Sequence, residues 1–252
     1  MRTKLRALVP LAAAVLPFAA LAAPASADTG SSSYQTTLNP LNHSTGSGMA
    51  MITVHGSTAD VKLSWSGLAA KFGGGAYPHV EHIHIDGQGA CPTTSADKNG
   101  DGVISTTEGG PAYGGIGTTL STSGDTSPAA GTNIKIAPSG PSTNYSRTIN
   151  LDPKTLSSLQ NGTAVVVVHG LDPARLSKKA QNEKSDLVPS LPLAATSPAL
   201  CGVLTAMPTG GVSTGTGSTS GTEDLGLLAL GGGLVAVGAG ALVSRKRATA
   251  RI

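Results

Sequence analysis

Residues 79–108 read HVEHIHIDGQGACPTTSADKNGDGVISTTE, and the rest of the chain is organised around this stretch. It holds three of the six histidines, one of the two cysteines and a twelve-residue run, 97–108, that is rich in oxygen ligands. We expect a strand over residues 80–85 and a cation-binding loop over residues 97–108. The stretch therefore predicts a β-domain that binds metal ions.

The two ends of the chain carry apolar segments. Residues 1–27 combine a basic start, an apolar run and a final Ala-Ser-Ala, which predicts a secretory signal peptide; an uncleaved membrane anchor is the alternative. Residues 225–244 contain no charge and match the ~20 residues that cross a bilayer, which favours a transmembrane segment over a buried core helix. The basic residues of 245–252 predict that this tail faces the cytoplasm.

The segment before the predicted membrane span, residues 206–224, is dominated by Gly, Ser and Thr and predicts a flexible spacer. This leaves residues 28–205 as one folded domain. The layout resembles that of Gram-positive surface proteins, although a complete Leu-Pro-x-Thr-Gly sorting motif is missing. We expect an exported protein on the extracellular face of the membrane or in the cell wall, with sortase attachment and membrane retention both open.

The net charge of the folded part narrows its possible partners. Without three basic residues in the signal and four in the tail, 10 of the 17 Lys and Arg remain against 14 Asp and Glu, a net charge of −4. This argues against nucleic acid as a partner and leaves metal ions and the membrane, with no protein partner indicated.

In an exported chain Cys91 and Cys201 predict one disulfide, and two free thiols are the alternative.

Short β-rich segments separated by Gly, Ser, Thr and Pro indicate an all-β sandwich or barrel. The expected strands are residues 49–55, 58–65, 80–85, 114–123, 133–137, 145–151, 164–169 and 201–204. The first two are expected to form a hairpin. Residues 153–160 predict one turn of helix, and residues 173–184 a short exposed helix or a loop.

Three histidines are predicted to converge on one metal ion. His82 and His84 are two apart in a strand and so point to the same face, and His169 ends the β-branched strand 164–169. Three imidazoles suit copper or zinc and do not suit a hard cation. We predict a copper site here, with His79 or His55 as a fourth ligand, against the alternative of hydrogen-bonded histidines without metal.

The order of these features resembles the copper/zinc superoxide dismutase family and the related CHRD domain over residues 49–204. The matching elements are His82-Ile83-His84, Cys91, the run from Val165 to His169, and Cys201-Gly202-Val203. The resemblance implies a Greek-key β-sandwich, copper at the three histidines and a disulfide between the two cysteines.

The chain departs from that family at two places. No histidine lies between Cys91 and Val168, so neither the zinc site nor the bridging histidine is expected, and Pro198 stands where the family has an arginine. The terminal segments and the resemblance together predict a surface-anchored, superoxide dismutase-like domain with residual redox activity. The alternative is a non-enzymatic, CHRD-like structural or interaction module.

Residues 97–108, DKNGDGVISTTE, match every constrained position of the EF-type calcium loop. The expected ligands are Asp97, Asn99, Asp101, the carbonyl of Val103, Ser105 and Glu108. An acidic, glycine-rich turn is the alternative. Pro92 and the glycines of residues 109–115 are expected to exclude flanking helices, so we predict a calcium loop inserted in the β-domain with a structural role.

Four further residues near these motifs are His79, Glu81, Asp86 and Trp65. His79, Glu81 and Asp86 are expected at solvated loop positions, with hydrogen bonding to the metal-binding histidines as the alternative. Trp65 is expected in the core.

Overall fold

The computed structural model describes residues 30–208. The predicted signal peptide, most of the predicted spacer, the predicted membrane segment 225–244 and the basic tail lie outside these residues. Within residues 30–208, no helix has the length and apolar character needed to cross a membrane.

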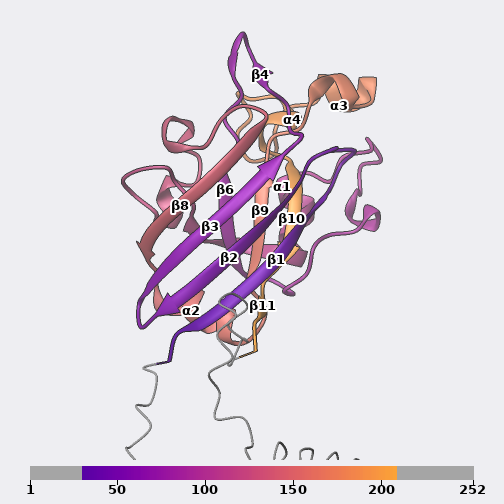
Figure 1. Cartoon of the computed structure of the whole chain (residues 1–252). Helices are drawn as coiled ribbons and strands as arrows, with labels where there is room; N and C mark the ends of the chain where they lie inside the picture. Colours follow the sequence, from indigo (N-terminus) through magenta and orange to yellow (C-terminus); the bar gives the residue numbers. More distant parts are fainter. Residues whose placement is uncertain (1–29, 209–252) are drawn as a thin grey trace, which may run out of the picture. The chain divides into compact units, whose positions relative to one another are not determined.

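The domain is mostly β, as the sequence predicts, and its main element is a curled antiparallel sheet (Figure 1). The strand order is β7-β6-β9-β10-β1-β2-β3-β8, with β11 beside β1. These strands are β1 Ser32–Pro40, β2 Ser47–His55, β3 Thr58–Ser66, β6 Glu81–Asp86, β7 Gly114–Thr119, β8 Ser142–Asn150, β9 Val165–His169, β10 Pro198–Val203 and β11 Thr205–Ala206. A separate pair joins β4 (Lys71–Phe72) to β5 (Gly75–Ala76).

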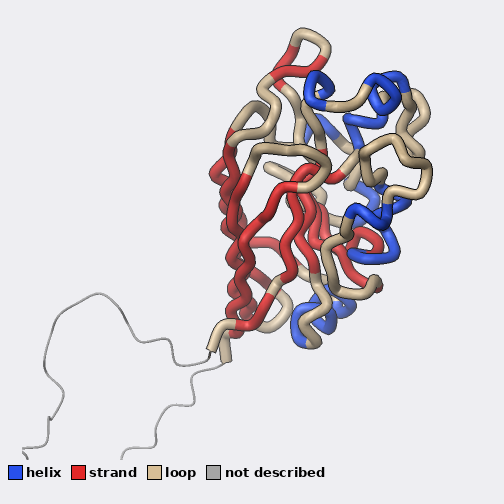
Figure 2. The backbone as a smooth tube through the Cα atoms, turned by 90° about the vertical axis from the view of Figure 1, so that its right-hand side faces the viewer, coloured by secondary structure: helices blue, strands red, loops and turns tan. Residues whose placement is uncertain are grey.

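Short helices and loops gather on one side of the molecule, while strands form the other side (Figure 2). The α-helices are α1 Thr106–Tyr113, α2 Pro153–Gln160, α3 Lys178–Asn182 and α4 Leu193–Thr196. Single 3-10 turns occur at η1 Thr94–Ala96, η2 Pro128–Ala130, η3 Ile134–Ile136 and η4 Pro173–Arg175. The predicted helix at residues 153–160 is therefore confirmed.

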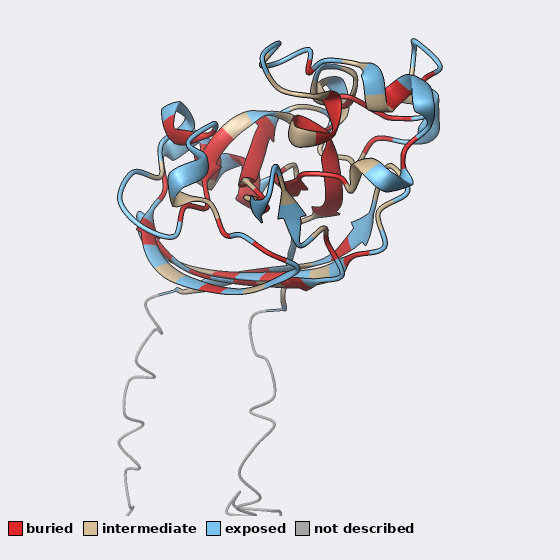
Figure 3. Ribbon diagram, turned by 90° about the horizontal axis from the view of Figure 1, so that it is seen from above, coloured by how far each residue is buried: buried red, intermediate tan, exposed pale blue. Residues whose placement is uncertain are grey.

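We call β1, β2, β3 and β8 the outer half of the curled sheet and β7, β6, β9 and β10 its inner half. The hydrophobic core lies between these two halves. In β3, Ala59, Val61, Leu63 and Trp65 are buried while the residues between them are more exposed, and they share one apolar cluster with residues of β6, β9 and β10. Figure 3 shows this alternation along the outer half of the sheet and mostly buried strands in the inner half, where β9 is buried throughout and β7 begins at more exposed residues. Because the sheet curls over on itself, the outer half needs only one apolar face.

The inner half of the sheet has a second buried face, and this face positions the candidate site. Ile83 and Val166 point into the main core. Their neighbours His82 and His84 therefore point the opposite way, beside Val167 and Val165, their cross-strand partners in β9. Loops and short helices cover this face.

One expected strand is wrong, and strand β1 forms where no strand is expected. Residues 133–137 contain the 3-10 turn η3 rather than a strand; the Asn133 side chain accepts a hydrogen bond from the Lys135 N–H and caps this turn. Strand β1 was not expected, because Tyr34 and Leu38 are its only large apolar residues that point inward. Pairing with β2 along seven residues forms this strand in spite of its weak local pattern.

The expectation that no helix follows the predicted calcium loop is also wrong. Ser105 and Glu108 form a capping box at the start of α1, in which the Glu108 N–H donates to Ser105 Oγ and the Ser105 N–H donates to Glu108 Oε2. Tyr113 packs its ring against Gly109, where a Cβ would lie 2.5 Å from the ring. Capping and packing outweigh the low helix propensity of two glycines and a proline.

Candidate metal centre

The structure brings His82 and His84 of β6 together with His169 of β9. One ring nitrogen from each side chain lies within 4.8 Å of the other two. Within residues 30–208, this is the one group of three or more His, Cys, Asp or Glu side chains that approach so closely. The alternation of β6 and the end of β9 thus place the imidazoles as the sequence predicts.

Each imidazole in this group uses one ring nitrogen to bond a backbone carbonyl. The bonds join His82 Nε2 to Gly131 O at 2.9 Å, His84 Nδ1 to Gly114 O at 2.9 Å, and His169 Nδ1 to Thr196 O at 2.6 Å. A carbonyl only accepts, so each of these nitrogens carries the proton and the other nitrogen of the ring has a free lone pair. Such bonds set the tautomer and orientation of metal-binding histidines.

The three lone-pair nitrogens are buried and have no hydrogen-bond partner. They are His82 Nδ1, His84 Nε2 and His169 Nε2. Buried polar atoms without a partner are uncommon and costly in folded proteins. A metal ion bound by all three nitrogens would satisfy them at once.

Burial keeps the three rings neutral. Desolvation lowers the pKa of His82 well below its usual value, that of His84 to about 3 and that of His169 to about 4. Proximity to His169 lowers the pKa of His82 and His84 further. At neutral pH a metal ion would therefore not have to displace a proton from any of the three rings.

The rings are closed off from solvent by the surrounding loops and helix α1. His82, His84 and His169 are only 2–4 % exposed. Tyr113 packs edge-on against His84 with 4.6 Å between ring centroids. Gly131 lets its loop approach closely, because a Cβ there would collide with Ile116.

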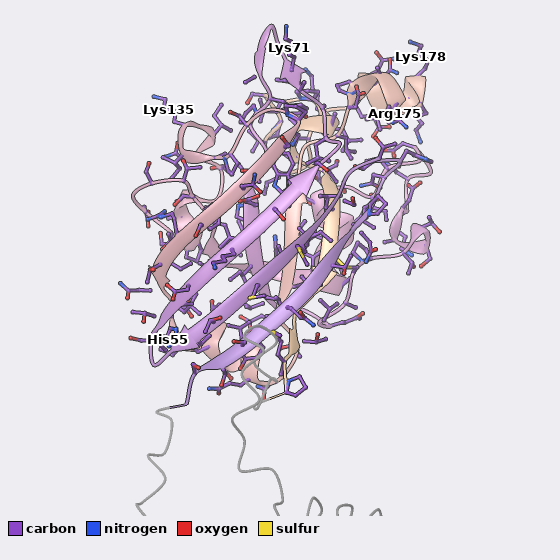
Figure 4. The ribbon with its side chains drawn as sticks, in the orientation of Figure 1. His55, Lys71, Lys135, Arg175 and Lys178 are labelled. Atoms are coloured by element: carbon purple, nitrogen blue, oxygen red, sulfur yellow. A yellow bond between two sulfur atoms is a disulfide. The ribbon has the colours of Figure 1, made fainter. Side chains whose placement is uncertain are left out.

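Neither histidine considered as a fourth ligand joins this group. His79 is buried, with its two ring nitrogens 2.9 Å from the carbonyl oxygens of Ala69 and His169. His55 is half exposed at the turn between β2 and β3, 3.5 Å from Asp60 (Figure 4). His79 instead supports the backbone of His169.

The expectation that Glu81 and His79 occupy solvated loop positions is wrong, whereas Asp86 is exposed as expected. Glu81 is the first residue of β6 and shares the inward face with Ile83, so its side chain lies in the main core. Trp65 is buried as expected, and its Nε1 donates to Glu81 Oε2. The strand alternation could have revealed this position of Glu81.

The predicted calcium loop is curled, and its carboxylates point inward to backbone N–H groups. Asp97 accepts from Gly100 and Gly102, at 2.8 and 2.9 Å, and Gly102 has a φ of +90° that favours glycine. Glu108 Oε1 accepts from the Lys98 N–H at 2.8 Å and so joins the two ends of the loop.

The loop positions expected to bind calcium are not all brought to ligand distance of one another. Asp101 and Asn99 contact each other, with 2.9 Å from Asn99 Nδ2 to Asp101 Oδ2, and Ser105 caps α1. The Val103 side chain packs in the main core, but the expected ligand at this position is its carbonyl oxygen, which this contact does not test. The carboxylates of Asp97, Asp101 and Glu108 do not form a group within 4.8 Å.

Residues 177–186 pack against this loop, a relationship that sequence analysis missed. Ser177 Oγ donates to Asp101 O at 2.7 Å and Lys179 Nζ donates to Asn99 O at 2.6 Å. A hydrogen bond shared with Asp101 raises the pKa of the exposed Glu183.

The sulfur atoms of Cys91 and Cys201 lie at bonding distance, 2.01 Å apart. Cys201 pairs with Val167 across the sheet, on the face that carries His82. The crosslink therefore ties the loop after β6 to β10 beside the candidate metal centre.

Comparison of the chain with models of known protein families finds no match, and no curated protein sequence matches it significantly.

Proposed function

We propose that this chain is an exported, surface-anchored, superoxide dismutase-like β-domain that binds copper at His82, His84 and His169. The observation that carries the proposal is the set of three buried ring nitrogens, each with a free lone pair and each on a ring oriented by a backbone carbonyl. No proton has to leave these rings when a metal ion binds.

The donor set favours copper, and cuprous copper in particular. Three imidazoles suit copper or zinc. The group contains no carboxylate within 4.8 Å, so a bound ion would bring its full charge into a buried, uncharged environment. A singly charged ion costs less to bury than a doubly charged one.

We also propose that the curled sheet is a Greek-key sandwich. The chain passes from β3 in the outer half of the sheet to β6 in the inner half, returns to β8 beside β3, and passes again to β9 beside β6. Such crossings between two packed halves are typical of Greek-key sandwiches. They support, together with the order of histidines and cysteines, the likeness to superoxide dismutase and CHRD domains.

Metal analysis of the full chain tests the copper site. After loading with copper and removal of free ion, we expect one equivalent bound to the wild type and none bound specifically to His82→Ala/His84→Ala. The matched control is His43→Ala/His55→Ala, which removes two exposed histidines and should keep the copper. Equal copper in all three proteins would refute the proposal.

Calcium binding by residues 97–108 belongs to the same proposal. Its support is the complete loop motif, the inward carboxylates, and the helix α1 that begins within the motif. Calcium should raise the melting temperature of the wild type and leave that of Glu108→Gln unchanged. A wild-type melting temperature that does not respond to calcium would rule the site out.

Whether the copper site is catalytic separates two candidate functions. The near-complete burial of the three rings favours a non-enzymatic module that holds copper over one that admits a substrate. The copper-loaded wild type and the His82→Ala/His84→Ala variant should then remove superoxide at equal rates. A faster rate in the wild type would favour the redox enzyme.

A further inference from the structure

Helix α1 lies between the predicted calcium loop and the three histidines, and it contacts both. Its first turn contains Glu108, the last position of the loop motif. Glu108 Oε1 accepts a hydrogen bond of 2.8 Å from the N–H of Lys98, at the start of the same loop. A cation held by Glu108 would therefore act directly on the first turn of α1.

The first residue of α1 also reaches the histidine site. Thr106 Oγ1 donates to the Thr196 carbonyl oxygen at 2.6 Å. The same oxygen accepts from His169 Nδ1 at 2.6 Å. Thr106 thus helps to place the carbonyl that orients one of the three imidazoles.

The other end of α1 reaches a second imidazole. Tyr113 packs against the ring of His84, and the carbonyl of Gly114, which ends the helix, accepts from His84 Nδ1 at 2.9 Å. The Tyr113 hydroxyl donates to Thr106 O at 2.9 Å, so both ends of the helix are tied to each other. A shift of the first turn would reach Tyr113 as well as Thr196.

We propose that α1 couples the two sites, so that calcium in residues 97–108 raises the copper affinity of His82, His84 and His169, with Thr106 and Tyr113 as positioning residues. This inference rests on the proposed function. Calcium stabilises the arrangement of α1 in which Thr196 O and Gly114 O already orient two of the rings. Such coupling is reciprocal, so copper must raise the calcium affinity by the same factor.

Competition titrations on the full chain measure the coupling. Cuprous ion is buffered by a competing chelator, and the affinity of the protein for cuprous ion is compared in calcium-free and calcium-saturated buffer. We expect calcium to strengthen copper binding by roughly tenfold, within the usual range of allosteric coupling. The calcium affinity of the copper-loaded and copper-free protein should differ by the same factor.

Three threonine variants distinguish positioning from a general loss of stability. Thr106→Val removes the hydroxyl and should bring the coupling factor close to one while calcium still binds. Thr106→Ser keeps the hydroxyl and should keep the coupling. Thr58→Val, the matched control, removes a hydroxyl that donates to His55 O in the distant β2–β3 turn and should behave as the wild type.

The outcomes separate this inference from the proposed function. Copper that binds with equal affinity with and without calcium would overturn the coupling and leave the copper site intact. Calcium that fails to bind would overturn the calcium part of the proposed function and, with it, the coupling, while the copper site would stand. A chain that binds no copper would overturn the proposed function itself. If Thr106→Val kept the full coupling, Thr106 would not be a positioning residue.

Discussion

Trp65 Nε1 donates a hydrogen bond of 2.8 Å to Glu81 Oε2 within the core between the two halves of the sheet. The second carboxyl oxygen, Glu81 Oε1, is buried without a partner. Desolvation raises the pKa of Glu81 to about 8, and the bond from Trp65 offsets this only in part. The core therefore holds a carboxyl group that is neutral below that pH.

Ionisation of Glu81 should destabilise the fold as the pH rises. Its folded pKa of about 8 is above the ordinary value of 4.5, so its favourable contribution is complete below about pH 4.5 and is lost as the pH rises through about 8. In urea unfolding, the free energy of unfolding of Glu81→Gln should rise relative to that of the wild type over this pH range, by on the order of a few kcal/mol.

The native fluorescence of Trp65, the only tryptophan, should titrate near pH 8 in the wild type and not in Glu81→Gln. A stability difference between the two proteins that does not change with pH would contradict the assignment.

Copper affinity should be insensitive to mild acid. The pKa values of His84 and His169 are about 3 and 4, so protons should not compete with the metal until the pH falls towards those values. We expect nearly equal affinity at about pH 7 and about pH 5. A flexible three-histidine peptide, with pKa values near 6.5, is the control and should lose affinity steeply. An equally steep loss in the protein would show that its rings are not held neutral.

Two adjacent glycines in α1 should respond to alanine in opposite ways. A Cβ at Gly109 would lie 2.5 Å from Tyr113 Cε1, whereas a Cβ at Gly110 meets nothing within 4 Å. Gly109→Ala should cost about 1–3 kcal/mol and weaken copper binding through the displaced Tyr113 ring. Gly110→Ala should stabilise the helix by about 0.5–1 kcal/mol. Urea unfolding of both variants checks the sign, and equal shifts would refute the packing argument.

The Cys91–Cys201 crosslink should contribute strongly to stability. It closes a loop with a sequence separation of 110 residues, and loss of such a crosslink costs on the order of 4–5 kcal/mol in the chain-entropy account. Denaturant unfolding of Cys91→Ser/Cys201→Ser, compared with the reduced wild type, measures this cost. The two should agree, and a reductant should leave the double variant unchanged. A reduced wild type as stable as the oxidised protein would contradict the expectation.

The amino-acid sequence is enough to predict which residues can meet. The period of two in a strand places His82 and His84 on one face and Ile83 on the other, whatever the surrounding fold. The same period defines the buried face of β3. Motif spacing identified residues 97–108, and cysteine content identified the pair Cys91 and Cys201. These are local or compositional signals.

The orientation and burial of the three rings depend on contacts between distant parts of the chain. The carbonyls that orient His82 and His169 come from Gly131 and Thr196, 49 and 27 residues away along the chain. No local pattern encodes which ring nitrogen such a carbonyl engages, or that Glu81 is buried against Trp65. Helix α1 is only partly of this kind, because its capping box is local to Ser105 and Glu108, whereas the packing of Tyr113 on His84 is long-range. Long-range packing therefore decides burial, tautomer and the link between the two sites.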